Sequence, residues 1–181
     1  MRSPLLRTLV VGLTAATALV LPAVSAQASA PVKEHDTVQT SAPDGDAGVL
    51  VIKLTHSEAT SRLRASGITW SSSGGCSDRY NSTCTSFEQV NLATIQGAQT
   101  LKTASGCALN ITGGTEVGHA SGTYSHWNGY KLDYSLTTCI QNYVTRNFTY
   151  IGGNQWRSGS GNIYYRESNH WDVTYYNCGG C

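Results

Sequence analysis

All six cysteines of this chain lie after an N-terminal segment with the features of an export signal. That segment starts with basic residues, continues with an apolar run over 9–21 and ends in small residues over 26–30. These features are typical of a secretory signal peptide, with cleavage expected after Ala26 or Ala28. An even number of cysteines in an exported chain indicates a disulfide framework. The sequence therefore predicts a secreted protein, extracellular or in the cell wall, whose fold is constrained by disulfide bonds.

The spacing of the cysteines favours pairing between neighbours in the sequence. Cys178 and Cys181 form a Cys-x-x-Cys motif, which also occurs in redox proteins and in zinc sites. A redox motif is expected at the start of a helix, and no second Cys-x-x-Cys is present to complete a zinc site. We therefore predict three disulfides, namely Cys76–Cys84, Cys107–Cys139 and Cys178–Cys181.

Composition divides the chain into a signal peptide over 1–28, a disordered linker or short pro-segment over 29–48, and one folded domain over 49–181. Residues 29–48 are rich in Ser, Thr, Asp, Ala and Pro, as disordered segments are. The signal removes two of the 12 Lys and Arg, which leaves ten against 11 Asp and Glu. No basic cluster indicates a nucleic-acid partner, and no second apolar stretch is long enough to cross a membrane.

Apolar periodicity predicts a single α+β domain with an antiparallel sheet. We expect helices over 55–64 and 86–101, the second from an apolar stripe at helical spacing. We expect strands over 49–54, 108–112, 130–134, 148–151 and 171–176. Because side chains alternate along a strand, Lys131 and Asp133 should share one face while Leu132 points into the core.

Two short motifs carry candidate chemistry: His126 and Asp133 form His-x6-Asp, and Glu167 and His170 form Glu-x-x-His. Each is common by itself, but both occur here in a chain with only five histidines. Together they supply two imidazoles and a carboxylate for zinc, and a second carboxylate to activate water. Three protein ligands with a fourth position for water are typical of a catalytic zinc site. Glu167 and His170 are three apart, so we expect the chain to bend between them.

The segment 111–133 resembles the zinc D-alanyl-D-alanine peptidase family. The family signature is Ser-x-His-x-x-Gly-x-x-x-Asp followed by Glu-x-x-His, and its metal site is related to that of the Hedgehog signalling domain. Here the motif reads Ser-His-Trp-Asn-Gly-Tyr-Lys-Leu-Asp, with Ser125 directly before His126. The resemblance covers about the last hundred residues. It implies a sheet with helices on one face, zinc on His126, Asp133 and His170, and Glu167 as general base and acid.

The same resemblance implies a monomeric metallopeptidase that hydrolyses peptides of bacterial peptidoglycan. The D-Ala-D-Ala bond is the first choice, and a stem-peptide or cross-bridge bond is the second. Relatives usually carry an arginine in a Gly-Tyr-Arg-like turn, where a guanidinium can bind a carboxylate through two hydrogen bonds. The equivalent turn here is Gly-Gly-Thr-Glu over 113–116, without a cation. The task is left to Arg79, Arg166, His119 or no residue. We predict Arg79 as the substitute, with His119 as a second candidate for substrate binding or oxyanion stabilisation.

Three alternatives stay open. Asp172 lies two residues after His170, and we predict that it orients a ligand imidazole; the other interpretation is an ordinary polar strand residue. The domain as a whole is either an enzyme or a zinc-containing module that binds or signals without hydrolysis, and the presence of Glu167 favours the enzyme. A metal-free carbohydrate-binding module would leave the ligand spacing as coincidence.

Overall fold

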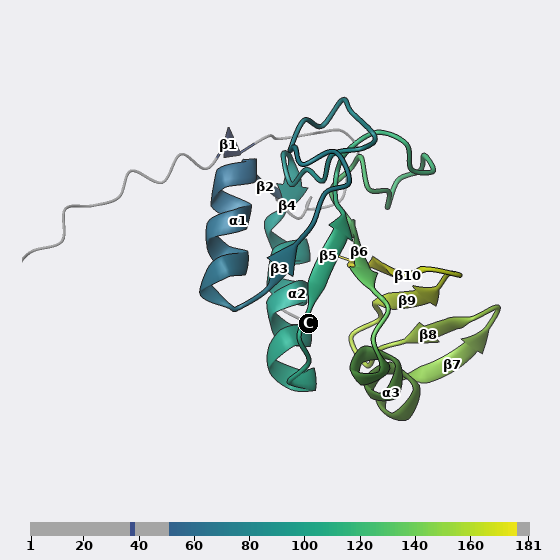
Figure 1. The fold of residues 1–181 in the computed structure, drawn as a ribbon. Helices are drawn as coiled ribbons and strands as arrows, with labels where there is room; N and C mark the ends of the chain where they lie inside the picture. Colours follow the sequence, from purple (N-terminus) through teal and green to yellow (C-terminus); the bar gives the residue numbers. More distant parts are fainter. Residues whose placement is uncertain (1–36, 39–50, 177–181) are drawn as a thin grey trace, which may run out of the picture. The chain divides into compact units, whose positions relative to one another are not determined.

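Residues 37–38 and 51–176 are described by the computed structural model of the protein, and they form helices and two β-sheets in an α+β arrangement (Figure 1). The predicted fold class is confirmed at this level. The predicted signal peptide lies outside the described residues. Of the predicted linker, only Thr37–Val38 are described, as strand β1 paired with β2 (Ile52–Leu54).

The larger sheet is mostly antiparallel, as predicted, and only its pair β3–β5 is parallel. Its strands, in spatial order, are β3 (Thr69–Trp70), β5 (Asn110–Gly113), β6 (Lys131–Ser135), β10 (His170–Thr174), β9 (Ile163–Arg166), β8 (Gln155–Arg157) and β7 (Thr149–Gly152). The smaller sheet has the order β1-β2-β4, where β4 is Val90–Asn91. The structure thus adds the short strands β1, β3, β4, β8 and β9 to those predicted.

Helix α1 (His56–Ala65) forms where the sequence predicted it, because Thr55 and Glu58 close a capping box at its start. Helix α2 (Leu92–Ser105) starts later than predicted. Gln89 has a φ of 64° and the chain then forms β4, so residues 86–91 are not helical. The apolar residues Phe87 and Val90 are buried as the stripe predicted, but from a loop and a strand.

Helix α3 (Thr138–Asn147) was not predicted. Thr137 caps it by accepting a hydrogen bond from the Ile140 N–H at 3.3 Å. Only Ile140 and Val144 of this helix are buried. Two apolar residues one turn apart are too few to reveal a helix by periodicity, so its formation depends on packing against the rest of the core.

The two central strands of the larger sheet separate the core from the candidate site. Leu132 and Tyr134 of β6, and Trp171 and Val173 of β10, are at most 1% exposed and belong to one apolar cluster with residues of α2. The intervening side chains, including Asp133, point to the opposite face. The predicted alternation in β6 is therefore present, and it places Asp133 on the face turned away from the core.

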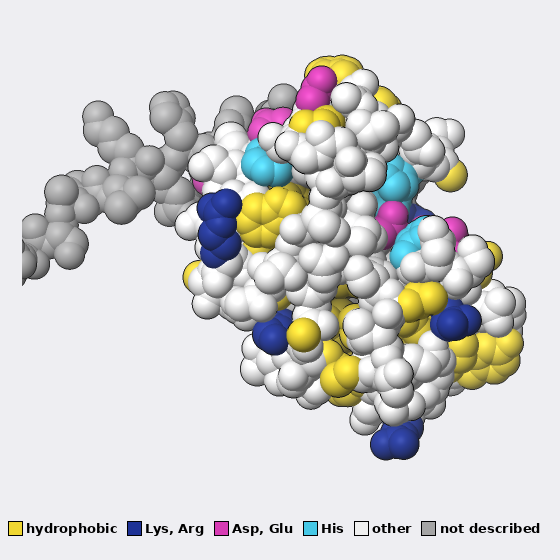
Figure 2. Space-filling model, viewed as in Figure 1, with side chains coloured by type: hydrophobic (Ala, Val, Ile, Leu, Met, Phe, Trp, Pro, Cys, Tyr) yellow, Lys and Arg dark blue, Asp and Glu magenta, His cyan; other side chains and the backbone are white. Residues whose placement is uncertain are grey.

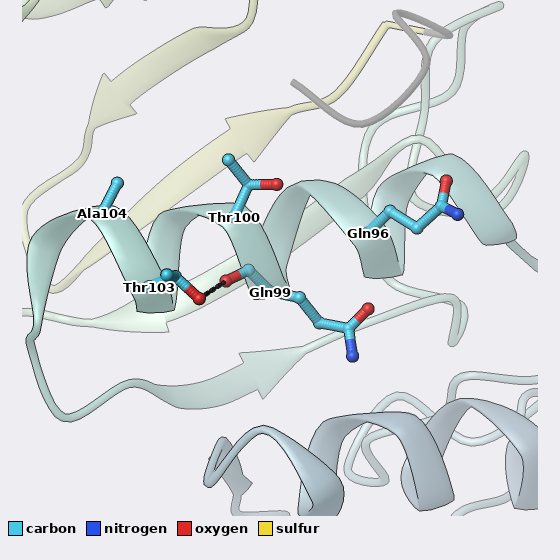
Figure 3. Close-up of a pocket in the computed structure, with 5 residues that line it drawn as sticks. All are labelled: Gln96, Gln99, Thr100, Thr103 and Ala104. Carbon is cyan, nitrogen blue, oxygen red and sulfur yellow. Dashed lines mark hydrogen bonds between the residues drawn. The ribbon is translucent and has the colours of Figure 1, made fainter.

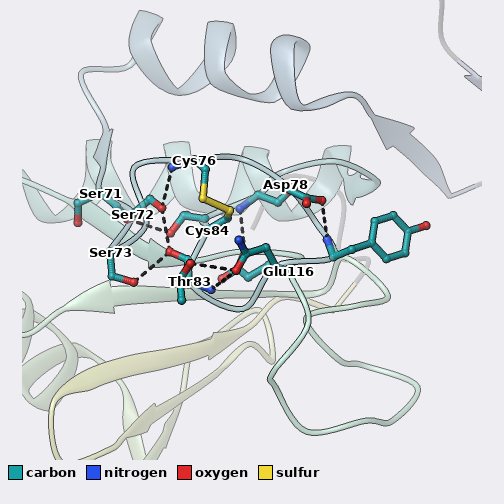
Figure 4. The surroundings of a disulfide bond; sticks show 12 residues. Ser71, Ser72, Ser73, Cys76, Asp78, Thr83, Cys84 and Glu116 are labelled. Carbon is teal, nitrogen blue, oxygen red and sulfur yellow. Dashed lines mark hydrogen bonds between the residues drawn. A yellow bond between two sulfur atoms is a disulfide. The ribbon is translucent and has the colours of Figure 1, made fainter.

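Two of the predicted disulfides, Cys76–Cys84 and Cys107–Cys139, are present. The first closes a polar loop in which Ser72 Oγ donates to the Thr83 carbonyl oxygen at 3.0 Å, and it lies beside Glu116 (Figure 4). The second ties α3 to the segment before β5. Cys178 and Cys181 lie outside the described residues.

All six cysteines are expected to be oxidised in the secreted protein, because the described four already form two disulfides and the remaining pair is close in sequence. A thiol assay on the unfolded, unreduced protein should detect no free thiol. Two reactive thiols that map to Cys178 and Cys181 would contradict the third pairing.

Candidate metal centre

The structure brings the three predicted zinc ligands together around one oxygen atom. Asp133 Oδ1 lies 3.3 Å from His126 Nε2 and 3.4 Å from His170 Nε2. Asp133 pairs with Asp172 across β6 and β10. His170 comes two residues before Asp172 in β10, so its side chain lies on the same face. His126 belongs to the loop before β6. The ligands therefore come from one loop and two neighbouring strands.

A tight turn brings His126 back toward β6. The Gly129 N–H donates to the His126 carbonyl oxygen at 2.8 Å, and the Tyr130 N–H donates to the Ser125 carbonyl oxygen at 3.1 Å. Gly129 has a φ of 77°, and a Cβ there would lie 2.6 Å from the Gln89 carbonyl oxygen. Only glycine satisfies both conditions, which accounts for the glycine in the motif.

Each predicted ligand imidazole has one ring nitrogen held by an oxygen acceptor. His126 Nδ1 lies 2.6 Å from the Gly114 carbonyl oxygen, and His170 Nδ1 lies 2.8 Å from Asn169 Oδ1. These oxygens accept, so each Nδ1 carries the proton and each Nε2 presents its lone pair to Asp133. Such outer hydrogen bonds are typical of metal-binding histidines.

Asp133 is placed to serve as the central ligand. Its Oδ1 is buried and has no hydrogen-bond partner, which is costly unless a cation is bound. Burial by itself raises the pKa of Asp133. When the imidazoles are protonated, a hydrogen bond from His126 and the positive charges of His126, His170 and His119 outweigh burial and lower this pKa below its ordinary value. Zinc bonds of about 2.0–2.1 Å in tetrahedral geometry separate ligand atoms by about 3.3–3.4 Å. The spacings of Asp133 Oδ1 from His126 Nε2 and His170 Nε2 match that value. The group whose potential ligand atoms all lie within 4.8 Å of one another is His119, His126 and Asp133, and it could hold a metal ion.

Glu167 lies beside these ligands in the turn between β9 and β10. Its N–H donates to the His170 carbonyl oxygen at 3.1 Å, and this turn supplies the bend that the sequence required. Glu167 Oε2 lies 3.6 Å from His170 Nε2, and the side chain is 38% exposed. The carboxylate is thus next to the ligand atoms and open to solvent.

His119 joins the cluster more closely than the sequence predicted. The potential ligand atoms of His119, His126 and Asp133 all lie within 4.8 Å of one another. The His119 ring stacks on that of His126, with centroids 3.8 Å apart, and its Nδ1 lies 3.7 Å from Asp133 Oδ2. Its predicted role in substrate binding stays a prediction, whereas its position makes it a candidate ligand.

Glu116 holds the other side of His119 and was not predicted as a site residue. Glu116 Oε1 lies 3.2 Å from His119 Nε2, and this contact raises the pKa of His119. Burial by itself raises the pKa of Glu116, but hydrogen bonds from His119 and from the N–H groups of Ser86 and Gly114 lower it below its ordinary value. A signal was present in the sequence, since residues 116–119 form a second Glu-x-x-His.

Arg79, predicted to bind substrate, connects two loops of the site. Its Nε donates to the Thr115 carbonyl oxygen at 3.2 Å, and its Nη2 donates to the Trp127 carbonyl oxygen. The guanidinium also lies over the Trp127 ring, 3.7 Å from its centroid. Two of its N–H groups are therefore engaged with backbone carbonyls, and its contact with substrate stays a prediction.

Asp172 does not hydrogen-bond to a ligand imidazole, contrary to the prediction. Its Oδ2 pairs with Lys131 Nζ at 2.6 Å, and its Oδ1 has no hydrogen-bond partner. The physical reason is that Lys131 lies on the same face of the sheet and supplies a charge, while Gly114 and Asn169 already hold the two imidazoles. Asp172 therefore lies near the site without orienting its ligands.

A hollow of about 380 Å³ adjoins the cluster and is lined by residues 116–122 with Ser125, Trp127 and Asn128. Histidine and acidic side chains lie together on the surface at the right of Figure 2. A larger hollow of about 460 Å³ runs along α2 and is lined by Gln96, Gln99, Thr100, Thr103 and Ala104 (Figure 3). None of these five side chains ionises, so the hollow beside His119 is the better candidate for chemistry.

Comparison of the chain with protein-family models, with curated proteins and with solved structures gives no match.

Proposed function

We propose that this protein is a secreted zinc metallopeptidase that hydrolyses peptide bonds of bacterial peptidoglycan. The observation that carries the proposal is the buried, unpartnered Asp133 Oδ1 with two imidazole nitrogens at 3.3 and 3.4 Å and the Glu167 carboxylate beside them. The signal-like N-terminus and the two disulfides support secretion. Among the described residues, no helix is long and apolar enough to span a membrane.

His126, Asp133 and His170 would hold the metal. A bound zinc ion polarises a carbonyl group and lowers the pKa of water to about 7. Gly114 and Asn169 keep the two imidazoles in the tautomer that leaves Nε2 free to bind. The protein thus supplies a prearranged donor set, with the apolar core of the sheet behind it.

Glu167 would move the proton. Its carboxylate is partly exposed beside His170, so it can reach both a water molecule and a bound peptide. In the proposed reaction it takes a proton from the attacking water and then passes it to the leaving amine. Its turn is closed by the backbone N–H, which leaves the carboxylate beside His170.

Peptidoglycan as substrate rests on the motif resemblance, with the D-Ala-D-Ala bond as first choice. One observation favours the second choice, an internal stem-peptide or cross-bridge bond. The turn where relatives carry arginine here carries the buried carboxylate of Glu116, and no Lys or Arg lines the described hollow beside it. A terminal carboxylate would therefore meet no cation among the residues that line this hollow.

A non-hydrolytic zinc module is the second candidate function. It is favoured by the position of His119, which with the three predicted ligands gives enough protein donors to fill a tetrahedral site. Closed sites with four protein ligands are typical of structural zinc.

Digestion of purified peptidoglycan, followed by mass spectrometry of the released fragments, tests the proposal. The zinc-loaded protein should release free D-Ala if it cuts the terminal bond, or shortened or uncrosslinked peptides if it cuts an internal bond. Removal of the metal by a chelator should abolish release, and added zinc should restore it. Absence of any product from every peptidoglycan type tested, with zinc bound, would favour the non-hydrolytic module.

A further inference from the structure

His119, like the two predicted ligand histidines, has one ring nitrogen held by an oxygen and the other facing Asp133, but with the roles of Nδ1 and Nε2 exchanged. Glu116 Oε1 lies 3.2 Å from its Nε2, and its Nδ1 faces Asp133 Oδ2 at 3.7 Å. A carboxylate can only accept from Nε2–H, so Nδ1 is the nitrogen available for the metal. A histidine whose second N–H is held by a carboxylate is a common arrangement in metal sites. We propose that His119 is a fourth protein ligand of the same metal and that Glu116 orients it.

Glu116 is fixed firmly enough to serve as that support. It is 3% exposed, and its carboxylate accepts hydrogen bonds from the N–H groups of Ser86 at 2.8 Å and Gly114 at 3.0 Å. The adjacent Thr115 donates its N–H to the Ser86 carbonyl oxygen at 2.7 Å. The disulfide loop of Cys76 and Cys84 lies beside this carboxylate (Figure 4). A buried charge held in this way keeps the imidazole in one orientation.

The backbone also makes room for this arrangement. A Cβ at Gly113 would lie 2.5 Å from Asp133 Oδ2, the oxygen that faces His119. Glycine at this position therefore lets the Asp133 carboxylate lie close to β5. In consequence Oδ1 faces His126 and His170, while Oδ2 faces His119. All three imidazoles converge on one carboxylate.

The inference rests on the metal site of the proposed function and changes its coordination. Three imidazoles and one carboxylate would complete a tetrahedral set, so water would bind only by expanding the coordination or by displacing His119. His119 lies in a loop between two glycines with positive φ, Gly118 at 108° and Gly122 at 151°.

Cobalt substitution followed by proton NMR counts the histidine ligands in the wild-type protein. Each ligand imidazole keeps one exchangeable N–H, and the paramagnetic ion shifts these protons far from the rest of the spectrum. Three such signals are expected, from His119, His126 and His170. Two signals that persist unchanged in His119→Ala would overturn the inference.

Zinc affinity, measured by competition with a chelator, gives a second test. His119→Ala should weaken zinc binding by more than about 10-fold, and Glu116→Gln should weaken it by about 10–100-fold, as loss of outer support does. His56→Ala is the matched control, since His56 lies on α1 and accepts a hydrogen bond from the Phe87 N–H. Wild-type affinity in His119→Ala would contradict the proposal.

These results separate the inference from the proposed function. Two cobalt-shifted signals in a protein that digests peptidoglycan would refute the fourth ligand and leave the peptidase intact. Three signals in a folded protein that digests no peptidoglycan would support the fourth ligand and refute the peptidase. Near-ultraviolet circular dichroism of each variant distinguishes loss of a ligand from loss of the fold.

Discussion

His126→Ala and His170→Ala are each expected to remove zinc from the purified protein, which in the wild type holds about one zinc ion per chain. Each change deletes an Nε2 that lies 3.3 or 3.4 Å from Asp133 Oδ1. Each histidine supplies one of the three protein ligands of the proposed catalytic site, so its loss has a large effect on zinc binding. Metal analysis after passage over a chelating resin measures the result.

His56→Ala serves as the control for these two variants, because it also removes a partly buried imidazole but lies on α1. Its zinc content should equal that of the wild type. Equal zinc in the wild type, His126→Ala and His170→Ala would refute the ligand assignment.

Glu167→Gln is expected to keep the fold and the zinc but to lose activity. The amide preserves the shape of the side chain and cannot accept the proton of water. General-base catalysis contributes about 10²–10⁴-fold, so release of peptidoglycan peptides should fall by at least that order. The initial rate of product release, with zinc content measured on the same sample, checks this expectation.

Glu58→Gln is the matched control, a carboxylate-to-amide change in the capping box of α1. It should leave the rate of hydrolysis unchanged and alter stability little, because glutamine also completes a capping box. Full activity in Glu167→Gln would show that another group activates the water, and Asp172 would be the next residue to replace.

Local sequence patterns determined several parts of this protein. The spacing of His126, Asp133 and His170 predicted residues that the structure places around one oxygen. Nearest-neighbour pairing predicted the two described disulfides, of which Cys76–Cys84 closes a short loop with a sequence separation of 8 and Cys107–Cys139 spans a separation of 32. The alternation around Leu132 predicted which face of β6 packs on the apolar core. Each of these features depends on residues close together in the sequence or on a strong chemical preference.

The tertiary structure alone decided where helix α2 starts and that helix α3 forms. Helix α2 starts at Leu92 because Gln89 adopts a positive φ, and α3 forms with only two buried side chains. Neither feature has a periodic signal.

The contacts around the ligands likewise depend on distant segments. Gly114 orients the imidazole of His126, and Lys131 pairs with Asp172 on a different strand. Glu116 itself is fixed by the Ser86 N–H, 30 residues earlier in the chain. Spacing along the sequence predicts which residues can bind a metal, and it already places Asn169 beside His170 and Glu116 beside His119. Only packing between separate segments brings Gly114 to His126 and the imidazoles to Asp133.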